Sequence, residues 1–413
     1  MSKIDDLLKK YCPNGVEVGT LGELGEFYGG LTGKSKEDFK DGNAKFITYM
    51  NVYSNLKLNL KTDEKVKISD GEKQHTIEYG DILFTGSSET PDECGMSSVL
   101  CDITSEKLYL NSFSFGFRFF DKKLFEPEFT KYLFRSNDLR KQIIKTASGV
   151  TRFNVSKERM KKVVIPIPPI EVQKEIAHIL DSFTELTAEL TAELSARKKQ
   201  YAYYRDELLT FENDVSVITK TIGEISLFRR GSFPQPYGKA EWYDGDGAMP
   251  FVQVADIGED MRLVDDTKRK ISKVAQPKSV FAPKGSIIIS LQGSIGRIAV
   301  TQFDAYIDRT VAIFQDISKE LHPKYFVYQL QRVFAQKEKT ARGGTIKTIT
   351  KEEFTEFPID IPPFAVQQRI VNILDNFDAI CSDLQSGLPA EIEARKKQYE
   401  YYRDKLLSFQ PLT

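Results

Sequence analysis

The sequence is poor in the residues that build metal centres and reactive thiol sites. Its 413 residues include four cysteines, none in a Cys-x-x-Cys pair, and three scattered histidines. That spacing offers no metal-ligand set, so we expect no bound metal. Proline, glycine or charged residues also interrupt every apolar run, and the first residues lack the apolar core of a signal peptide. These features predict a cytoplasmic protein.

Neither sign of charge is in excess. Lysine and arginine number 58 and aspartate and glutamate 59, for a net charge of −1. The overall basic footprint of many nucleic-acid binders is therefore missing, and any such binding must depend on local patches. A hydrophobic fraction of 40% with 28% charged residues is typical of a globular protein, and the length predicts two or three domains.

Two patterns that resemble catalytic motifs are incomplete. The stretch YGGLTGKSK, residues 28–36, ends as a phosphate-binding loop does, but Tyr28 stands where that loop needs its first glycine. The stretch DIPPF, residues 360–364, resembles the loop with which adenine methyltransferases grip a base, but an isoleucine separates Asp360 from Pro362. We therefore expect no catalytic residues and no cofactor bound by this chain.

The chain contains two copies of one design. The stretch IPPIEVQKEIAHILD, beginning at Ile167, recurs as IPPFAVQQRIVNILD, beginning at Ile361. Further along, ARKKQYAYYRDELL at Ala196 recurs as ARKKQYEYYRDKLL at Ala394. The preceding 160 or so residues match more faintly but in the same order. A period of about two hundred residues is too long for a solenoid repeat, so each copy is a domain followed by a helix.

Heptad spacing after each Pro-Pro pair predicts two long helices. The first would extend about 60 Å, longer than a single globular domain needs. The second changes frame near Ser386 to Pro389, which indicates a stutter or a break. We expect the two helices to pair as an antiparallel coiled coil rather than to pack separately on their own domains. The expected seam residues are Ile176, Leu180, Phe183, Leu190, Leu194, Tyr201, Tyr204, Leu208, Ile370, Leu374, Phe377, Leu384, Ile392, Tyr399, Tyr402 and Leu406.

The two globular parts have the same mixed pattern. Short apolar strands such as KFITYM and GSIIIS alternate with helices, among them the single helix expected from PEFTKYLFRSNDLRKQIIKTA. This pattern predicts an α+β class with a mixed sheet in each part. The pseudo-twofold repeat then relates two similar domains separated by the helix pair.

Basic, glycine-containing loops occupy equivalent places in the two copies. The first is TASGVTRFN, from Thr146, and the second is KTARGGTIK, from Lys339. Backbone N–H groups, hydroxyls and arginines of such loops can contact phosphates and base edges. A charge cluster can also be an ordinary solvated face. The candidate DNA-contacting residues here are Lys145, Ser148, Gly149, Thr151, Arg152, Lys339, Arg342, Gly343, Gly344, Thr345 and Lys347.

Further candidates follow matched strands or lie near the start of each copy. Side chains at strand tips can donate to and accept from base edges, although polar tips are also ordinary turn residues. Exposed cations near the start of each copy can contact phosphates. These candidates are Tyr49, Asn51, Ser87, Ser88, Gln253, Gln292 and Arg297 at strand tips, and the cations Lys34, Lys36, Arg229 and Arg230.

With the Pro-Pro lead-ins, the repeated RKKQYxYYRDxLL and two variable domains, the whole chain resembles the specificity subunit of a Type I restriction–modification system. The resemblance implies that each domain reads one half of a bipartite double-stranded DNA site. It also implies that the coiled coil sets the spacing between the halves and docks two modification subunits. The expected segments are target-recognition domains at 1–168 and 214–362, each followed by a helix, at 169–213 and 363–413.

The resemblance also implies where the chemistry of the complex resides. S-adenosylmethionine would be held by the modification subunits, and ATP with magnesium by two restriction subunits, with nothing catalytic in this chain. Residues 187–194 read TAEL twice, a length adjuster in this family. The alternative is a coiled-coil scaffold whose two domains bind proteins instead of DNA.

Overall fold

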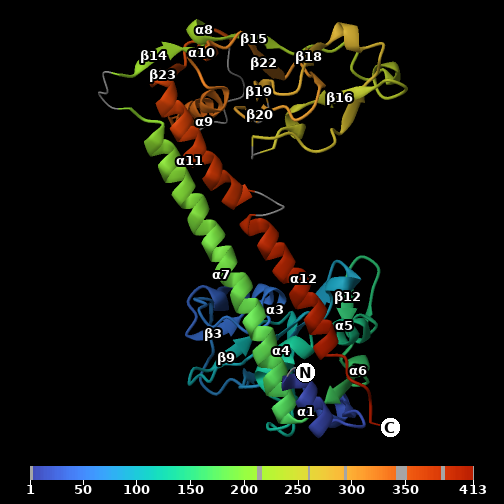
Figure 1. Cartoon of the computed structure of the whole chain (residues 1–413). Coiled ribbons are helices and arrows are strands. Elements are labelled where there is room, and N and C mark those ends of the chain that lie inside the picture. The colour runs from blue at the N-terminus through green and yellow to red at the C-terminus, as the bar shows by residue number, and fades with distance from the viewer. Residues whose placement is uncertain are drawn as a thin grey trace. The chain divides into compact units, whose positions relative to one another are not determined.

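The structure is a computed structural model of the whole chain, which divides into two compact units (Figure 1). The first comprises Met1–Glu189 and Ile392–Thr413, and the second Leu190–Glu391. The described residues are 3–211, 216–258, 261–292, 295–340, 351–382 and 387–412.

The first unit contains one copy of the globular design. Its helices are α1 (Lys3–Tyr11), α2 (Leu21–Leu24), α3 (Tyr49–Ser54), α4 (Pro127–Leu133), α5 (Asn137–Ile144) and α6 (Lys157–Met160), with 3-10 helices η1 (Lys36–Phe39) and η2 (Pro91–Glu93). Its strands are β1 (Glu17–Thr20), β2 (Gly25–Gly29), β3 (Ala44–Ile47), β4 (Lys65–Val66), β5 (Thr76–Ile77), β6 (Ile82–Thr85), β7 (Ser87–Ser88), β8 (Ser97–Val99), β9 (Leu108–Leu110), β10 (Ser114–Phe119), β11 (Ala147–Ser148), β12 (Phe153–Val155) and β13 (Val164–Ile167).

The second unit contains the other copy. Its helices are α8 (Ile222–Ile225), α9 (Pro323–Thr340) and α10 (Lys351–Thr355), with 3-10 helices η3 (Ala240–Trp242), η4 (Val254–Asp256) and η5 (Gln276–Lys278). Its strands are β14 (Ile218–Thr221), β15 (Leu227–Arg230), β16 (Met249–Val252), β17 (Arg269–Ile271), β18 (Val280–Ala282), β19 (Ile287–Ser290), β20 (Ile298–Val300), β21 (Ala305–Ile307), β22 (Val311–Gln315) and β23 (Pro358–Ile361).

The two copies share their sheet topology. The order β2-β10-β6-β8 in the first unit matches β15-β22-β19-β20 in the second, and β4-β3-β9-β5 matches β17-β16-β21-β18. The pairs β3–β9 and β16–β21 are parallel while their neighbours are antiparallel. This confirms the predicted α+β class with mixed sheets. The small sheet β11-β12-β7 is described in the first unit alone, because residues 341–350 lie outside the described ranges.

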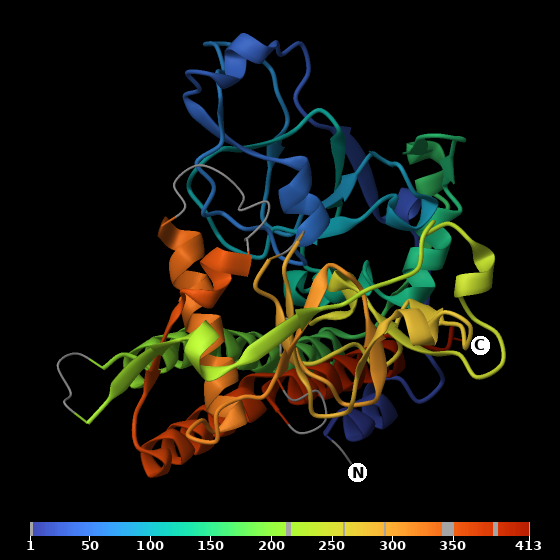
Figure 2. The same ribbon diagram turned by 90° about the horizontal axis from the view of Figure 1, so that it is seen from above.

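Three long helices carry the repeated sequence. They are α7 (Ile170–Leu208), α11 (Phe364–Ser382) and α12 (Leu388–Leu406). Figures 1 and 2 both show α7 alongside α12 in the first unit and alongside α11 in the second. Between α11 and α12 lie residues 383–386, which are outside the described ranges, at the place where the sequence predicts a stutter or break.

Aromatic pairs show that the helices run antiparallel. In the first unit, Phe183 stacks on Tyr402 with ring centroids 5.3 Å apart. In the second unit, the equivalent pair is Phe377 with Tyr204, at 5.8 Å. Each phenylalanine near the start of one copy's helix therefore meets the tyrosine near the end of the other copy's helix. This reciprocity is what an internal pseudo-twofold requires.

Each domain core is completed by residues from the far end of the other copy's helix. Leu407, just after α12, is buried in the core of the first unit, and Leu209, just after α7, is buried in the core of the second. These two leucines occupy equivalent places in the repeated sequence. Apolar burial therefore holds each helix pair against its own unit.

Two secondary-structure predictions were wrong in detail. The strand expected from KFITYM ends at Ile47, and Thr48 begins α3 by accepting a hydrogen bond from the Asn51 backbone. The helix expected from PEFTKYLFRSNDLRKQIIKTA is two helices, α4 and α5, because Ser136 caps a new start. In both places a hydroxyl cap decides the local structure, which apolar periodicity does not report.

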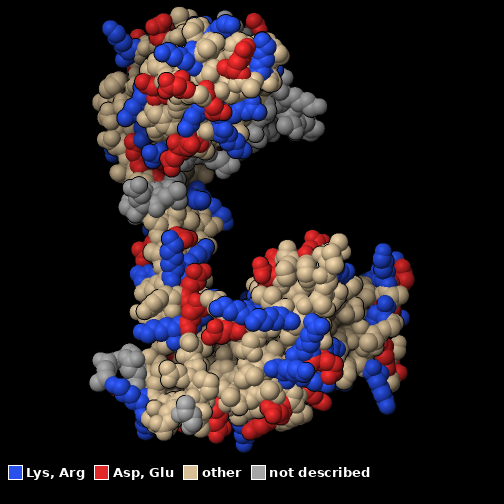
Figure 3. Space-filling view, turned by 90° about the vertical axis from the view of Figure 1, so that its right-hand side faces the viewer, with Lys and Arg blue, Asp and Glu red and all other residues tan. Residues whose placement is uncertain are grey.

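Charged side chains of both signs are mixed on the face of the molecule drawn in Figure 3. Figure 3 shows lysine and arginine interspersed with aspartate and glutamate on the displayed face of both units. This agrees with the net charge of −1. Binding of a negatively charged partner to this face would therefore depend on individual side chains and not on an extended positive potential.

Candidate nucleic-acid interface

An open hollow in the first unit brings together five residues predicted from the sequence. Its volume is about 960 Å³. The residues come from α3, β7, the segment before η2, η2 itself, the turn before β10 and the β11–β12 turn. They are Tyr49, Met50, Tyr53, Ser87, Ser88, Glu89, Glu93, Phe113, Val150, Thr151 and Arg152. We call this feature the hollow; Tyr49, Ser87, Ser88, Thr151 and Arg152 are the predicted members.

Helix α3 supplies one wall. Val52 is buried beneath it, which turns Tyr49 and Tyr53 outwards on one face. Their rings stack with centroids 6.1 Å apart and planes inclined by 15°. The Tyr49 hydroxyl also donates to the backbone oxygen of Ser87, at 2.8 Å. Because this contact joins α3 to β7, the aromatic wall has a fixed position.

The β11–β12 turn supplies the opposite wall. Gly149 has φ +153°, and a Cβ there would lie 1.9 Å from the backbone oxygen of Arg152, so the turn needs glycine. Strand β12 pairs with β7, placing Asn154 opposite Ser87. Arg152 consequently reaches the Ser87 hydroxyl with Nε at 3.0 Å and Nη2 at 2.9 Å.

The hollow also contains two carboxylates. Glu93 accepts hydrogen bonds from the hydroxyls of Tyr53, at 2.7 Å, and Thr90, at 2.9 Å. The Tyr53 hydroxyl holds the pKa of Glu93 below its ordinary value, so Glu93 is ionised at neutral pH. Glu89 is exposed at the rim. Neither glutamate was predicted, nor were Met50, Phe113 and Val150, because nothing in the sequence marks these residues as neighbours.

Other predicted residues of the first unit lie elsewhere. Lys34, expected to contact phosphate, is instead held within the unit: its ammonium lies 2.6 Å from a Glu72 carboxylate oxygen and 2.6 Å from the backbone oxygen of Lys67. Asn51, expected at a strand tip, lies on α3 and bonds the backbone of Asn59. Lys36, Lys145, Ser148 and Gly149 are solvent-accessible, Lys36 at the start of η1 and the others around β11.

In the second unit the predicted residues are less concentrated. Gln253 directly follows β16, at the strand tip predicted for it, and its backbone N–H donates to the buried Asp256 carboxylate at 2.8 Å where η4 begins. Arg297 donates to the backbone oxygen of Ile257, and Gln292 is half-buried after β19. Arg229 and Arg230 are exposed on β15. Arg342, Gly343, Gly344, Thr345 and Lys347 lie outside the described residues, as does the side chain of Lys339, which belongs to α9.

Most of the predicted seam residues in the described ranges are buried or half-buried. Ile176, Leu180, Ile370, Leu374 and Ile392 are buried. Leu190 lines an apolar recess beside α11 and α12, and Leu384 lies outside the described residues. Tyr204 is 38% exposed even though it stacks on Phe377. Phe183, Leu194, Tyr201, Leu208, Phe377, Tyr399, Tyr402 and Leu406 are half-buried.

A buried glutamine fixes each long helix to its domain, and sequence reasoning missed both. Gln173 accepts from the Glu126 backbone N–H at 2.8 Å and donates to the oxygens of Leu124 and Pro168. Gln367 makes the same three kinds of bond in the second unit, to the backbone of His322, Glu320 and Pro362. The signal available in the sequence was a glutamine at the same distance after each Pro-Pro pair.

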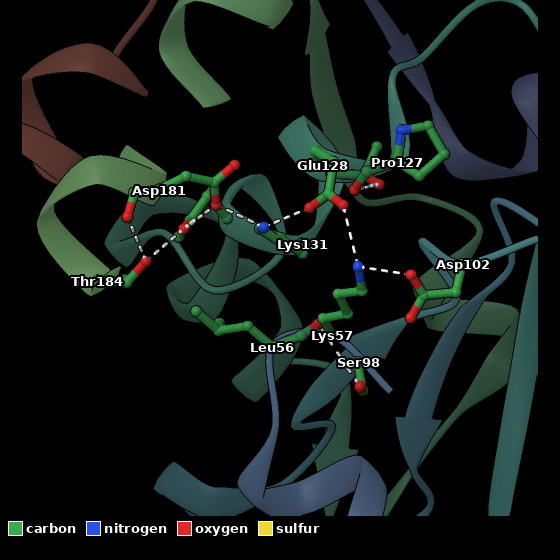
Figure 4. A network of polar contacts seen from close by, with 11 residues as sticks. Leu56, Lys57, Ser98, Asp102, Pro127, Glu128, Lys131, Asp181 and Thr184 are labelled. Atoms are coloured by element: carbon green, nitrogen blue, oxygen red, sulfur yellow. Dashed lines mark hydrogen bonds and ion pairs between the residues drawn. The ribbon is translucent and has the colours of Figure 1, made fainter. Parts of the chain in front are cut away.

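A second pair of contacts joins the helices to their domains. The Tyr132 hydroxyl donates to Asp181 at 2.7 Å, and the equivalent Tyr328 donates to Asp375 at 2.6 Å. In the first unit Asp181 also pairs with Lys131, which contacts Glu128, and Glu128 in turn faces Lys57 (Figure 4). This charged network connects α7 through α4 to the segment that follows α3.

Potential metal ligands do not cluster among the described residues. No group of three potential metal-ligating side chains was found among them. Asp360 of the DIPPF stretch pairs with Arg332 at 2.8 Å and the following prolines lead into α11, which is a structural role. All four cysteines are free thiols. No helix in the described ranges is both long and apolar enough to span a bilayer.

Comparisons with known proteins agree with this architecture. The family described as "Type I restriction modification DNA specificity domain" matches residues 13–200 and again 217–394. The chain is 38% identical over 271 residues to the Type I restriction enzyme EcoR124I/EcoR124II specificity subunit of Escherichia coli, an alignment that spans 62% of this chain and 65% of that protein.

Solved structures show the same fold over nearly the whole chain. The HsdS subunit from Thermoanaerobacter tengcongensis has a TM-score of 0.54 at 20% identity, covering 96% of this chain and 97% of that one. A chain from a study of complex assembly and conformational transition of the type I R-M system has a TM-score of 0.68 at 19% identity, with 96% and 98% covered. The chain belongs to the family of Type I restriction modification DNA specificity domains, whose model it matches twice.

Proposed function

We propose that each domain reads one half of an asymmetric, bipartite DNA target, while the paired helices set the number of unread base pairs. The observation that carries this proposal is that the two copies share their fold and their contacts with the long helices but differ in their open surfaces. Equivalent contacts, such as Phe183 with Tyr402 and Phe377 with Tyr204, relate the copies. The hollow's residues differ from those at matched places in the second unit, so the halves of the target differ as well.

Exchange of one domain tests independent reading. Residues 214–362 would be replaced by the corresponding domain of a relative with a different target, and the methylated motif would be mapped by single-molecule sequencing in cells that hold the modification subunits. One half of the motif changes and the other stays. A change in both halves would overturn independent reading. Binding must also weaken steeply as salt rises, since phosphate contacts release counterions.

The TAEL repeat sets the spacer in this proposal. Each four-residue unit contributes about 6 Å of helix, comparable with one to two base steps. Deleting residues 191–194 removes one unit, shortens the unread spacer and leaves both half-sites unchanged. A deletion variant whose motif keeps its spacer length would contradict this role. Leu190, which lies in the preceding TAEL, stays in place in that variant.

The helices also dock the modification subunits, which bring S-adenosylmethionine; restriction subunits, with ATP and magnesium, complete the cytoplasmic complex. The repeated RKKQYxYYRD segments support two identical docking sites. Tyr203 is 64% exposed and its equivalent Tyr401 is 61% exposed, one in each unit. Replacing both tyrosines by alanine reduces co-purification of modification subunits, and single replacements remove one subunit each. Unchanged stoichiometry in the double variant would refute this docking face.

A further inference from the structure

We infer that Arg152 reads a guanine in the half-site of the first domain, with Ser87 as its positioning residue. The inference rests on the proposed function, since it assumes that the first domain meets DNA. It adds the base and the atoms that are recognised: the O6 and N7 acceptors that guanine presents in the major groove.

The geometry of the guanidinium carries the first step. Arginine has two donor forks: a side fork made by Nε–H and Nη2–H, and an end fork made by Nη1–H and the second Nη2–H. The Ser87 hydroxyl occupies the side fork, at 3.0 Å and 2.9 Å. Neither contact with Ser87 uses Nη1, and Arg152 is exposed, so the end fork is available to a partner. A bidentate contact to guanine O6 and N7 uses two parallel N–H donors of this kind.

Preorganisation is the second step. Ser87 is 7% exposed, and three contacts fix it: the Tyr49 hydroxyl on its backbone oxygen, the pairing with Asn154, and the arginine itself. Arg152 is exposed, but its hydrogen bonds to the buried Ser87 hydroxyl fix the plane of its guanidinium group. Less side-chain entropy is then lost when a base binds, which raises selectivity for a planar, bidentate partner.

The surroundings favour a base over a phosphate. Met50 is 59% exposed, Phe113 62% and Val150 91%, so apolar surface stands free around the guanidinium. Such side chains suit thymine methyl groups and base edges. Glu89 and Glu93 also line the hollow, and two carboxylates against one arginine repel a phosphate. A base edge carries no net charge and meets no such penalty.

A coupled measurement on protein and DNA tests the inference. The full complex with modification subunits is titrated with a duplex of the mapped motif, and each guanine of the first domain's half-site is replaced in turn by 7-deazaguanine, which lacks the N7 acceptor. One such replacement weakens the wild-type complex about 10-fold. In the Arg152→Ala complex, binding is weaker by about 10- to 100-fold and the same replacement causes no further loss.

Three further variants sharpen the outcome. Arg152→Lys keeps the charge but lacks the rigid planar fork that Ser87 holds in place, so discrimination at that guanine falls below that of the wild type. Ser87→Ala keeps Arg152 but removes the hydroxyl that fixes the plane of its guanidinium group. Discrimination at that guanine then falls, while the salt dependence of DNA binding is unchanged. Lys123→Ala, an exposed lysine outside the hollow, keeps wild-type discrimination.

The failures of the two proposals are distinguishable. If the wild-type complex shows no sequence preference, the proposed function itself is wrong. If the wild type is specific, but Arg152→Ala weakens every sequence alike and lowers the salt dependence, Arg152 contacts phosphate and the guanine inference is overturned. It is equally overturned if every 7-deazaguanine effect persists in that variant.

Discussion

The two copies of the domain agree where they meet the long helices and differ where they are open to solvent. Gln173 and Gln367 make the same bonds, and Tyr132 and Tyr328 each reach an equivalent aspartate. At the open surface, the first unit has the arginine of the hollow, while the matching position in the second copy is an isoleucine, Ile346, by sequence. A duplicated fold with unlike open surfaces is what the proposed two-part DNA target requires.

The difference extends into the helix junction. At the two places where the first unit has Glu128 and Lys131, the second has Lys324 and Val327. In the first unit Lys131 is the buried partner of Asp181, at 2.6 Å. In the second unit Lys324, whose side chain is 45% exposed, pairs with the equivalent Asp375 at 2.8 Å. The lysine that pairs with the aspartate stands one helical turn earlier in the second copy, and the ion pair is preserved. The junction between helix and domain therefore tolerates changes that keep a cation beside this aspartate.

The largest effect is expected where the copies agree. Gln173→Leu leaves a backbone N–H and two backbone oxygens in the junction without partners, which costs about 3 kcal/mol. Gln367→Leu costs the same in the second unit. Urea denaturation is followed by circular dichroism and by the fluorescence of Trp242, the sole tryptophan, which reports on the second unit.

The control for both is Gln368→Leu, next to the buried glutamine but half-buried, with an effect within about 0.5 kcal/mol. If one of the two substitutions lowered the free energy of unfolding strongly and the other did not, the two helix–domain junctions would not be equivalent.

A charge exchange tests the difference at the junction. Lys131→Val alone leaves Glu128 and Asp181 without their buried cation and costs about 1–3 kcal/mol. Adding Glu128→Lys reproduces the arrangement of the second unit and recovers more than half of that loss, while Lys57 keeps its contact with Asp102, at 2.8 Å. The measurement is a double-mutant cycle by urea denaturation.

Strict additivity of the two changes would show that the junction of the first unit cannot adopt the arrangement of the second. That result would limit the comparison to the glutamine and tyrosine contacts.

The smallest effect concerns the Lys34 turn, which the second unit lacks. Hydrogen bonds from the Lys34 ammonium, the Ser69 backbone N–H and the Gln74 side chain lower the pKa of Glu72 to about 2. A carboxyl whose folded-state pKa is depressed contributes stability above its unfolded value, about 4.3, and that contribution disappears as pH falls through about 2. The turn therefore loosens between about pH 4 and pH 2, seen as faster amide exchange at Ser69, which donates to Glu72.

Lys34→Met raises the pKa of Glu72 toward its ordinary value, measured by NMR titration of the carboxyl. DNA affinity changes little in this variant, because the ammonium is turned inward. Lys36→Ala, two residues on and exposed, is the matched comparison and weakens binding in a salt-dependent way. If Lys34→Met weakened DNA binding more than Lys36→Ala, the inward assignment of Lys34 would be wrong.

Sequence patterns alone were sufficient to predict the paired helices and the duplicated domains of this protein. Heptad spacing and the repeated IPP and RKKQY stretches predicted two antiparallel helices, because periodicity over many residues records which face is buried. The repeat also predicted the two similar α+β domains. The same reasoning failed at Tyr49 and Asn51, where one capping threonine converts an expected strand tip into a helix.

The sequence by itself determined the duplication, the helix pair and the family of this protein, since each of these is written in patterns between residues near one another or in matching copies. Tertiary structure decided which polar groups meet. Residues 49, 87 and 152 converge because β7 pairs with β12, and Lys34 turns inward because Glu72 lies beside it. Strand register and the partners of ion pairs depend on residues far apart in the sequence, so the spacing of nearby residues does not reveal them.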